Sequence, residues 1–215
     1  GPSSITLETW LYVTDFNTSP CADCAPIIWN QQKSYRFGTG NTQHIYVSLL
    51  NGTSAVTLTS AGTIAAKKWH HIAATFNGTK LKLYIDGTAT DSASYSSFNI
   101  TYGTTTSDVW IADPNTGYGG ILEETRIWDY ERTASQIKEG SYKHYSSAET
   151  GLILQYSYED GTPYANNTSV TKIADNTSNK INGVPYNFKM KDSTSNFVLG
   201  KSYCDTTVYG KFSVS

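Results

Sequence analysis

The sequence of 215 residues is poor in charge and has no long apolar run. Only 16% of its residues are charged, and the formal net charge is −2. Because the lysines and arginines form no basic run, the electrostatic footprint of a nucleic-acid-binding protein is missing. No apolar stretch approaches the roughly 18 residues that a membrane-spanning helix needs, so we expect no membrane insertion.

Cysteine is also scarce, and the three cysteines do not match a zinc-site pattern. Cys21 and Cys24 form a C-x-x-C, while Cys204 stands near the end of the chain. A structural zinc site needs about four ligands, and no second C-x-x-C or H-x-x-x-H follows. We expect a disulfide between Cys21 and Cys24. Pairing of Cys204 with one of the two is the alternative, and an odd thiol remains in either case.

Polarity comes from threonine, serine, asparagine and glycine rather than from charge. Tyrosine is abundant at 16 residues, whereas methionine occurs once. Such a composition is typical of an extracellular β-protein rather than of a helical cytosolic enzyme. With 38% hydrophobic residues the chain can build one sizeable core, and an all-β sandwich of this length is commonly a single domain.

The clearest structural signal is a pair of alternating runs around one turn. Residues 69–76 and 81–86 alternate with a period of two, and Asn77-Gly78 separates them. Asn-Gly tolerates the positive φ angles of a tight turn, so we expect an antiparallel hairpin, with Asp86-Gly87 as the next turn. The opposite face would carry His71 and Lys82. The buried face would carry Ile72, Ala74, Phe76, Leu81, Leu83 and Ile85.

Similar short strands recur at roughly ten-residue spacing, which predicts an all-β sandwich or barrel. Residues 133–138 are expected to form the only helical turn, with Thr133 as its N-cap. Weaker strand candidates are residues 93–101, 186–188 and 196–199. Residues 1–4 are typical of the cleavage scar of an expression tag. We expect one domain over residues 5–200, with residues 201–215 as a tail or the start of a following module.

Four motifs then occur in an order that is known from one family. They are ITLETW at residues 5–10, WHHIA at 69–73, LKLYIDG at 81–87 and GILEETRIW at 120–128. They resemble, in this order, strand segments of bacterial-type laminin-G-like domains. Residues 151–156 together with Asp175-Asn176-Thr177-Ser178 resemble a further segment, which many relatives carry at the start of the domain. The resemblance implies a concanavalin A-like jelly-roll sandwich of two antiparallel sheets.

Two departures from the family pattern stand out. The usual Asp-Glu pair is Glu123-Glu124 here, and the strand that often precedes the opening motif is missing before Ile5. Either the sequence begins inside the family pattern, or strands from residues 151–200 close the sheet in its place.

The same fold hosts glycoside hydrolases, which carry E-x-D-x-x-E on one strand with the carboxylates on one face. Glu123 and Glu124 are adjacent, so alternation predicts that they point to opposite faces, and no third carboxylate follows. We therefore expect no enzyme activity at this strand. Glu8 and Arg126 are expected to form a structural ion pair between neighbouring strands.

The spacing of the four histidines along the chain predicts no metal site. His70 and His71 are adjacent on a strand and would face opposite ways, so they cannot chelate one ion. His44 and His144 have no partner in the sequence.

Calcium is the ion that the sequence favours, because hard cations take several oxygen ligands from loops. Residues 112–117 offer Asp113 and Asn115 at a sheet end, where pentraxins, which share the fold implied by the resemblance, carry part of their calcium site. Asp23 or Asp15 near the cysteines would add a further oxygen. The alternative is that Asp113 and its neighbours form only a turn.

Sugar binding needs exposed aromatic faces beside planar polar groups. The candidates are Tyr118 and Asn115 in the same loop, Trp110 just before it, and Tyr35 and Tyr46 on strands. We expect the site at the rim where this loop meets the Cys21–Cys24 loop, because long loops on a rigid sandwich carry binding residues.

Together with the resemblance, these residues predict a non-catalytic extracellular module, part of a larger multidomain chain. It would bind a glycan or glycoprotein with the help of Ca²⁺. A structural or adhesive spacer that binds protein is the alternative, and a glycoside hydrolase is the third hypothesis.

Overall fold

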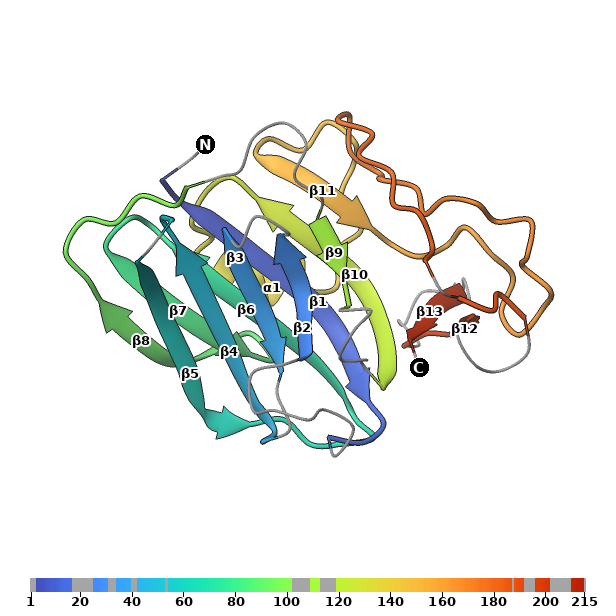
Figure 1. Cartoon of the computed structure of the whole chain (residues 1–215), viewed down its shortest axis with the longest axis horizontal. Coiled ribbons are helices and arrows are strands. Elements are labelled where there is room, and N and C mark those ends of the chain that lie inside the picture. Colours follow the sequence, from blue (N-terminus) through green and yellow to red (C-terminus); the bar gives the residue numbers. More distant parts are fainter. Residues whose placement is uncertain are drawn as a thin grey trace.

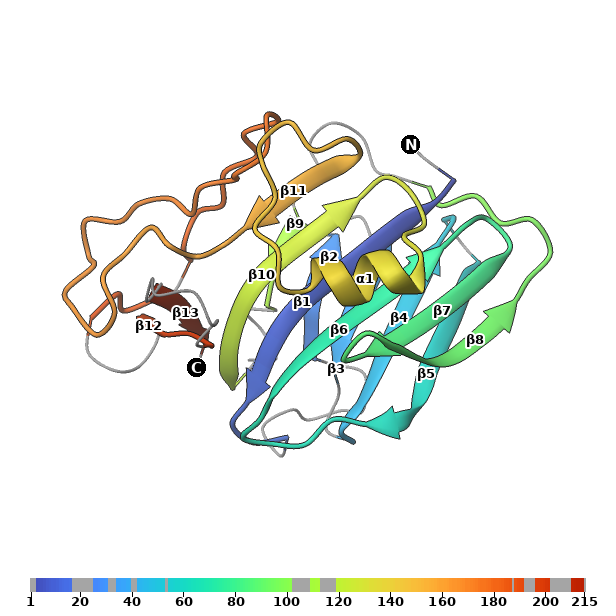
Figure 2. The same ribbon diagram turned by 180° about the vertical axis from the view of Figure 1, so that it is seen from behind.

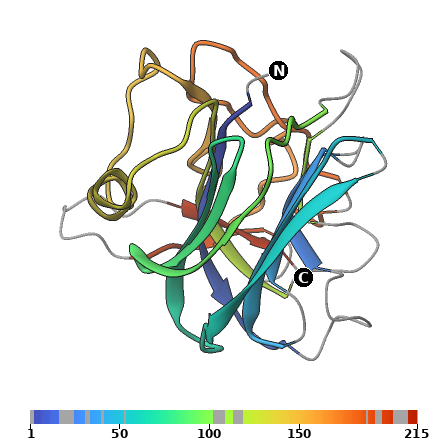
Figure 3. The same cartoon turned by 90° about the vertical axis from the view of Figure 1, so that its left-hand side faces the viewer.

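The computed structural model shows two β-sheets packed face to face, with one helix on the outside (Figure 1). The structure describes residues 3–16, 25–30, 34–39, 42–52, 54–101, 109–112, 119–186, 188–191, 196–201 and 210–214. The expected two-sheet antiparallel sandwich is confirmed, and Figure 3 shows the two layers from the side.

The larger sheet contains the first and the last strand of the described residues. Its strands are β1 (Ile5–Val13), β6 (Trp69–Phe76), β7 (Lys80–Ile85), β8 (Thr88–Ser94), β10 (Gly120–Trp128), β11 (Leu152–Tyr156), β12 (Phe197–Leu199) and β13 (Gly210–Val214). They follow the order β12-β13-β10-β1-β6-β7-β8, and β11 also pairs with β10.

The smaller sheet is built from the segment between β1 and β6, together with one later strand. Its strands are β2 (Ala25–Asn30), β3 (Tyr35–Thr39), β4 (His44–Leu50), β5 (Ala55–Thr63) and β9 (Val109–Ile111). They follow the order β5-β4-β3-β2-β9, so β9 forms one edge of this sheet.

The predicted hairpin forms with the expected register. Ile72 pairs with Ile85, and Phe76 pairs with Leu81, so their side chains share the core between the sheets. The Asp86-Gly87 turn is also confirmed, but it leads directly into β8, which begins earlier than the predicted strand at 93–101. The second face of the hairpin is not open to solvent at His71, which is 0% exposed.

Helix α1 (Ala134–Gly140) explains that burial, because it lies across the outer face of the larger sheet (Figure 2). The Thr133 side chain accepts a hydrogen bond from the Gln136 backbone at 3.2 Å, and the Gln136 side chain accepts one from Thr133 N at 2.8 Å. This capping box confirms Thr133 as the N-cap. Ile137 is 0% exposed and packs against Ala73 and Tyr84 of the sheet.

Strands from the last third of the chain cover the outer edge of β10. β11 pairs with Thr125–Trp128, and β13 pairs with Gly120–Leu122. Residues after 151 therefore extend the sheet beyond β10, as the second alternative for the missing family strand predicts. Residues 210–214 belong to this sheet, whereas residues 201–215 were expected to be a tail or the start of another module. Tyr186 and Phe188 lie outside any strand, so the strand predicted at 186–188 is wrong at those residues.

The packing of α1 on the β7–β8 turn can be tested at Gly87. A Cβ atom there would lie 2.9 Å from Lys138 Cβ, and the residue has a φ of 76°. Gly52 has a similar φ of 84°, but a Cβ there would meet nothing within 4 Å. We expect Gly52→Ala to lower the free energy of unfolding by about 1 kcal/mol through backbone strain alone. Gly87→Ala should cost about 1–3 kcal/mol more through overpacking.

Urea denaturation of the two variants measures this difference. Equal losses in the two variants would contradict a close contact between the turn and the helix.

Candidate functional site

Part of the predicted site falls outside the described residues. This applies to Cys21, Asp23 and Cys24 in the first loop. In the second loop it applies to Asp113, Asn115 and Tyr118. The local disulfide, the calcium site and the rim between the two loops therefore stay predictions.

Two of the predicted sugar-contacting tyrosines do not expose their rings. Tyr35 on β3 is 4% exposed and packs in the core between the sheets. Tyr46 on β4 is 6% exposed. Since a sugar can stack only on an open aromatic face, the expectation of exposed rings at these positions is wrong. Tyr35 shares its face of β3 with Phe37, and that face is directed at the larger sheet.

Trp110 meets an aromatic residue that the sequence did not single out. It lies on the edge strand β9, and its ring centroid is 6.1 Å from that of Tyr186, with the ring planes at 82°. Tyr186 is 61% exposed, and Trp110 is partly exposed. These two nearly perpendicular rings form a corner, in which the edge of one ring points at the face of the other and Tyr186 stays exposed.

The loop that carries Tyr186 is anchored by Asp175, which is 1% exposed. Its Oδ1 accepts hydrogen bonds from the backbone N–H groups of Gln155 and Thr177, both at 3.0 Å. Its Oδ2 accepts from Thr177 Oγ1 and from Ile181 N, both at 2.8 Å. One carboxylate therefore satisfies four donors and fixes the start of the segment that leads from Asp175 to Tyr186. Asp175 belongs to the second segment that resembles the family, and its role here is structural.

Apolar side chains accompany Tyr186 on the same loop. Ile181 is 46% exposed and Val184 is 77% exposed. Between them, Gly183 forms a two-way backbone bridge with Ile173, with hydrogen bonds of 2.8 and 2.9 Å. The loop is thus held in place at its base, while its apolar side chains face solvent.

A different set of candidates forms a buried charge cluster beneath α1. Glu8 Oε1 accepts hydrogen bonds from Arg132 Nη1 at 2.6 Å and from Trp128 Nε1 at 2.8 Å, and Arg126 Nη1 lies 3.5 Å away. The predicted Glu8–Arg126 ion pair is confirmed as part of this cluster. Burial opposes ionisation of Glu8, but the two arginines hold the pKa of its carboxyl below the usual value. All four side chains are almost completely buried.

His71 borders this cluster from β6. Its Nε2 lies 3.6 Å from Glu8 Oε2, and its ring meets the Trp10 ring edge-on at 5.3 Å. Burial lowers the pKa of His71 to about 4, although Glu8 acts in the opposite direction. His70 instead places Nδ1 2.8 Å from Asp86 Oδ2. The adjacent histidines therefore have different partners, as alternation predicts.

The expectation that Glu123 and Glu124 face opposite ways is wrong. The register of β1 with β10 pairs Glu8 with Arg126 but Trp10 with Glu123, so β10 contains one extra residue between these pairs. This is a β-bulge, and Glu124 within it has a φ of 51°. Because of this extra residue, both carboxylates point to the outer face of the sheet.

Neither carboxylate of this pair is open to a polysaccharide. Glu123 is 0% exposed, and its Oε2 accepts a hydrogen bond from Lys201 N at 3.0 Å. Glu124 is 5% exposed, and its Oε2 accepts one from Arg126 Nη2 at 2.8 Å. The Lys201 ammonium lies 3.3 Å from the centroid of the Trp10 ring, which further covers this side.

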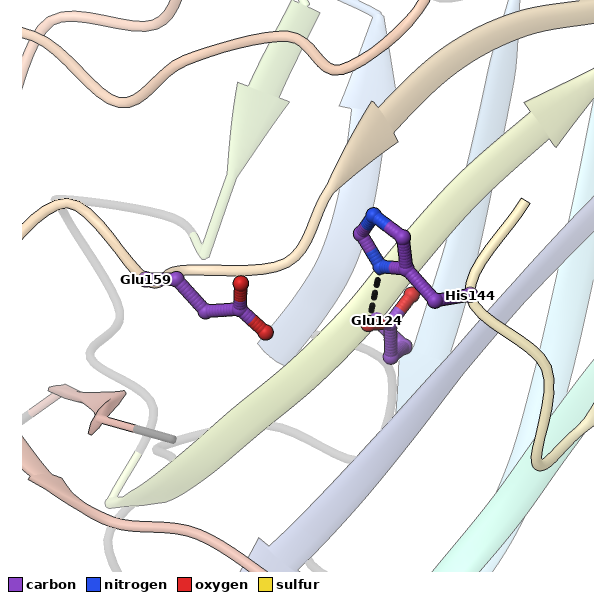
Figure 4. A group of neighbouring side chains, drawn as sticks. All are labelled: Glu124, His144 and Glu159. Carbon is purple, nitrogen blue, oxygen red and sulfur yellow. Dashed lines mark hydrogen bonds and ion pairs between the residues drawn. The ribbon is translucent and has the colours of Figure 1, made fainter. Parts of the chain in front are cut away.

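Glu124 also meets two loops that the sequence left unconnected. His144 follows α1, and its Nδ1 lies 3.4 Å from Glu124 Oε1. Glu159 follows β11, and one ligand atom from each of the three residues lies within 4.8 Å of the others (Figure 4). The hydrogen bond to Glu124 raises the pKa of His144 above its usual value. No partner of His144 was predicted, because Glu124 lies 20 residues away along the chain.

A family model described as the concanavalin A-like lectin/glucanases superfamily matches residues 1–138, which carry β1 to β10. The chain belongs to this superfamily. The laminin-G-like resemblance is thereby confirmed. The segments that hold Asp175, Glu159 and Tyr186 lie beyond the matched residues of this superfamily domain.

Solved structures with this lectin/glucanase fold include domains that bind sugars. A proposed carbohydrate-binding protein from Bacteroides ovatus has a TM-score of 0.61 and 19% identity, over 85% of this chain and 51% of that one. The CBM40 domain of the Ruminococcus gnavus IT-sialidase, bound to α2,3-sialyllactose, has a TM-score of 0.52 and 13% identity, over 66% of this chain and 83% of that one.

The binding domain of Paraclostridial Mosquitocidal Protein 1 has a TM-score of 0.52 and 15% identity, over 97% of this chain and 58% of that one. At these identities the likeness shows the fold alone. The chain spans about half of the Bacteroides ovatus chain. A search of curated proteins finds no match. Among the described residues, no helix has the length and apolar character needed to span a bilayer.

The buried His71 predicts how this lectin-fold domain responds to acid. Its pKa falls from 6.5 in the unfolded chain to about 4 in the folded one, so between these values only the unfolded chain binds the proton. The contribution of neutral His71 to the free energy of unfolding is then fully present above about pH 6.5. It is lost as the pH falls towards 4, by up to about 1.4 kcal/mol per pH unit. His144, with its raised pKa, acts in the opposite direction.

Comparison with His71→Gln isolates this contribution, because the variant keeps His144 and a neutral polar side chain at position 71. We expect the difference in unfolding free energy between parent and variant to change by about 2–3 kcal/mol from pH 7 to pH 4.5. A difference that is constant with pH would mean that His71 protonates freely in the folded domain.

The Asp175 anchor gives a second stability prediction. Asp175→Ala removes the acceptor of four hydrogen bonds, three of them from backbone N–H groups. Leaving buried donors unsatisfied should lower the free energy of unfolding by about 2–4 kcal/mol, measured in urea. Asp160→Ala is the control, because Asp160 accepts a hydrogen bond from only one residue of the neighbouring segment, Ala174. A loss no larger than in the control would contradict the anchoring role.

Proposed function

We propose that this domain is a non-catalytic carbohydrate-binding module whose sugar contact is the corner formed by Trp110 and Tyr186. The observation that carries the proposal is the open ring of Tyr186, 61% exposed and held against Trp110 at a sheet edge. An aromatic face binds the apolar C–H face of a sugar ring, while neighbouring polar groups take its hydroxyls.

Rigidity of the corner supports this role. Trp110 lies on a strand, and the loop of Tyr186 is fixed by Asp175 and by the bridge at Gly183. A ring that is already in place loses little conformational entropy when a ligand binds, so affinity does not have to offset an ordering cost. The known sugar complex of the CBM40 neighbour shows that this fold is compatible with glycan recognition.

The predicted rim fits the same location. Residues 113–118 follow Trp110 closely in the sequence, so Asn115 and Tyr118 would adjoin the corner. We propose that Asp113, Asn115 and Asp23 hold Ca²⁺ there, with sugar hydroxyls completing its shell. Extracellular location within a larger chain is part of the proposal, supported by the composition and by the partial coverage of the Bacteroides ovatus protein.

The absence of catalysis is supported by the burial of the acidic pair. Glu123 and Glu124 are 0% and 5% exposed, beneath Lys201 and the loop that follows α1. A glycosidase needs an acid and a second carboxylate on either side of the scissile bond, with access for the sugar between them.

One observation favours the spacer hypothesis as a second candidate. Ile181 and Val184 extend the exposed surface of Tyr186 with aliphatic side chains, which suit a protein partner at least as well as a sugar.

Glycan-array binding of the parent domain, with and without EDTA, tests the proposed function. We expect Tyr186→Ala to weaken the Kd of any glycan hit by about tenfold, since the stacking contact contributes about 1 kcal/mol or more. Tyr142→Ala is the matched control, because Tyr142 is also 61% exposed but lies against Trp10 on the helix side. Its binding should equal that of the parent.

Three results would count against the proposal. They are the absence of any glycan hit, binding that survives Tyr186→Ala, and equal losses in the two variants. Binding that is independent of EDTA would remove calcium from the proposal and leave the aromatic corner.

A further inference from the structure

Three potential metal ligands converge at the bulge of β10 from separate elements. Glu124 comes from the strand, His144 from the loop after α1 and Glu159 from the loop after β11 (Figure 4). The ligand atoms, one from each residue, lie within 4.8 Å of one another. The group shares no residue with the aromatic corner, and it combines a nitrogen donor with two carboxylates.

The spacing matches a small divalent ion. Glu124 Oε1 and His144 Nδ1 are 3.4 Å apart. Two ligands of a tetrahedral ion with bonds of about 2.0–2.1 Å are separated by about 3.3 Å. The first pair is therefore spaced as two ligands of one tetrahedral ion are, and the ligand atom of the exposed Glu159 lies within 4.8 Å of both.

Glu124 is oriented by a neighbour in the way that metal ligands commonly are. Arg126 Nη2 donates to Glu124 Oε2 at 2.8 Å, which directs Oε1 towards His144. Such an outer partner fixes the orientation of a coordinating carboxylate. Arg126 also donates to the Gly140 carbonyl at 3.1 Å and lies 3.5 Å from Glu8, so it does not depend on Glu124 alone for charge balance.

We propose that Glu124, His144 and Glu159 bind a divalent transition-metal ion of the zinc class, with a fourth position open to solvent. One imidazole with two carboxylates suits zinc, whereas Ca²⁺ takes six to eight oxygen ligands. The ion has a route to the site, because the His144 side chain is 53% exposed and Glu159 is exposed. Bound metal would tie the loop after α1 and the exit of β11 to the bulge of β10.

Titration of the purified domain with ZnCl₂ and with CaCl₂, followed by calorimetry and by thermal unfolding, tests the site. We expect Zn²⁺ to bind one to one and to raise the Tm, whereas any response to Ca²⁺ should be the same in the parent and in His144→Ala. His144→Ala and Glu159→Gln should each weaken zinc affinity at least tenfold. Both substitutions are at exposed side chains and should leave the fold intact, which the Tm of the metal-free variants checks.

Glu149→Gln is the matched control, because Glu149 is an exposed glutamate outside the group, and it should bind zinc as the parent does. The cysteines are the competing ligands, and Co²⁺ distinguishes them, since thiolate ligation adds an intense charge-transfer band that imidazole and carboxylate do not. Absence of zinc binding, binding unchanged in His144→Ala and Glu159→Gln, or a thiolate band would each overturn the proposal. Tyr186→Ala should lose glycan binding and keep zinc binding. Failure of the zinc proposal can therefore be told apart from failure of the proposed function.

Discussion

The carboxylate of Glu8 holds together the outer layer of this domain. Through Oε1 it binds Arg132 at 2.6 Å and Trp128 at 2.8 Å, and Arg126 lies 3.5 Å away. Arg132 immediately precedes α1, and Arg126 donates to carbonyls at the end of the helix and beyond it, so one buried anion fixes both ends of the covering layer. With Glu124 the cluster contains two anions and two arginines. A balanced cluster adds little net stability over an apolar core, but loss of one member leaves a buried charge unpaired, typically at about 3–5 kcal/mol.

The sequence predicts those structural features that neighbouring residues in the chain determine, and it misses those that depend on distant residues. The hairpin of β6 and β7 is set by alternation and by Asn77-Gly78, so its register was predictable. The capping box at Thr133 is equally local. The bulge at Glu124 depends on which residues of β1 lie opposite, so strict alternation failed there. Tyr186 was missed for a related reason: it lies in a loop, its partner Trp110 lies on the distant strand β9, and nothing in the intervening chain signals their contact.

The region after β11 is organised by side chains rather than by a strand ladder. Asn167 is 5% exposed, accepts from Thr162 N at 2.9 Å and donates to Asn196 Oδ1 at 2.8 Å, while Asn196 donates to the Ala165 carbonyl at 2.8 Å. Asp175 acts in the same way on its own neighbours. Asn, Asp and Thr side chains replace missing backbone partners, which explains why a segment of this composition is ordered with so little regular structure.

This organisation assigns different tasks to different parts of the chain. The residues matched by the superfamily build the smaller sheet, most strands of the larger sheet and the charged layer beneath α1. The segment after β11 passes Glu159, then Asp175, then Tyr186, so one connection carries a ligand to the outer side of β10 and an aromatic ring to the edge strand β9. Because side chains supply many of its internal hydrogen bonds, its exposed residues can change without disturbing a strand register. Both proposed sites therefore combine a residue of the matched domain, Glu124 or Trp110, with a residue beyond it, Glu159 or Tyr186.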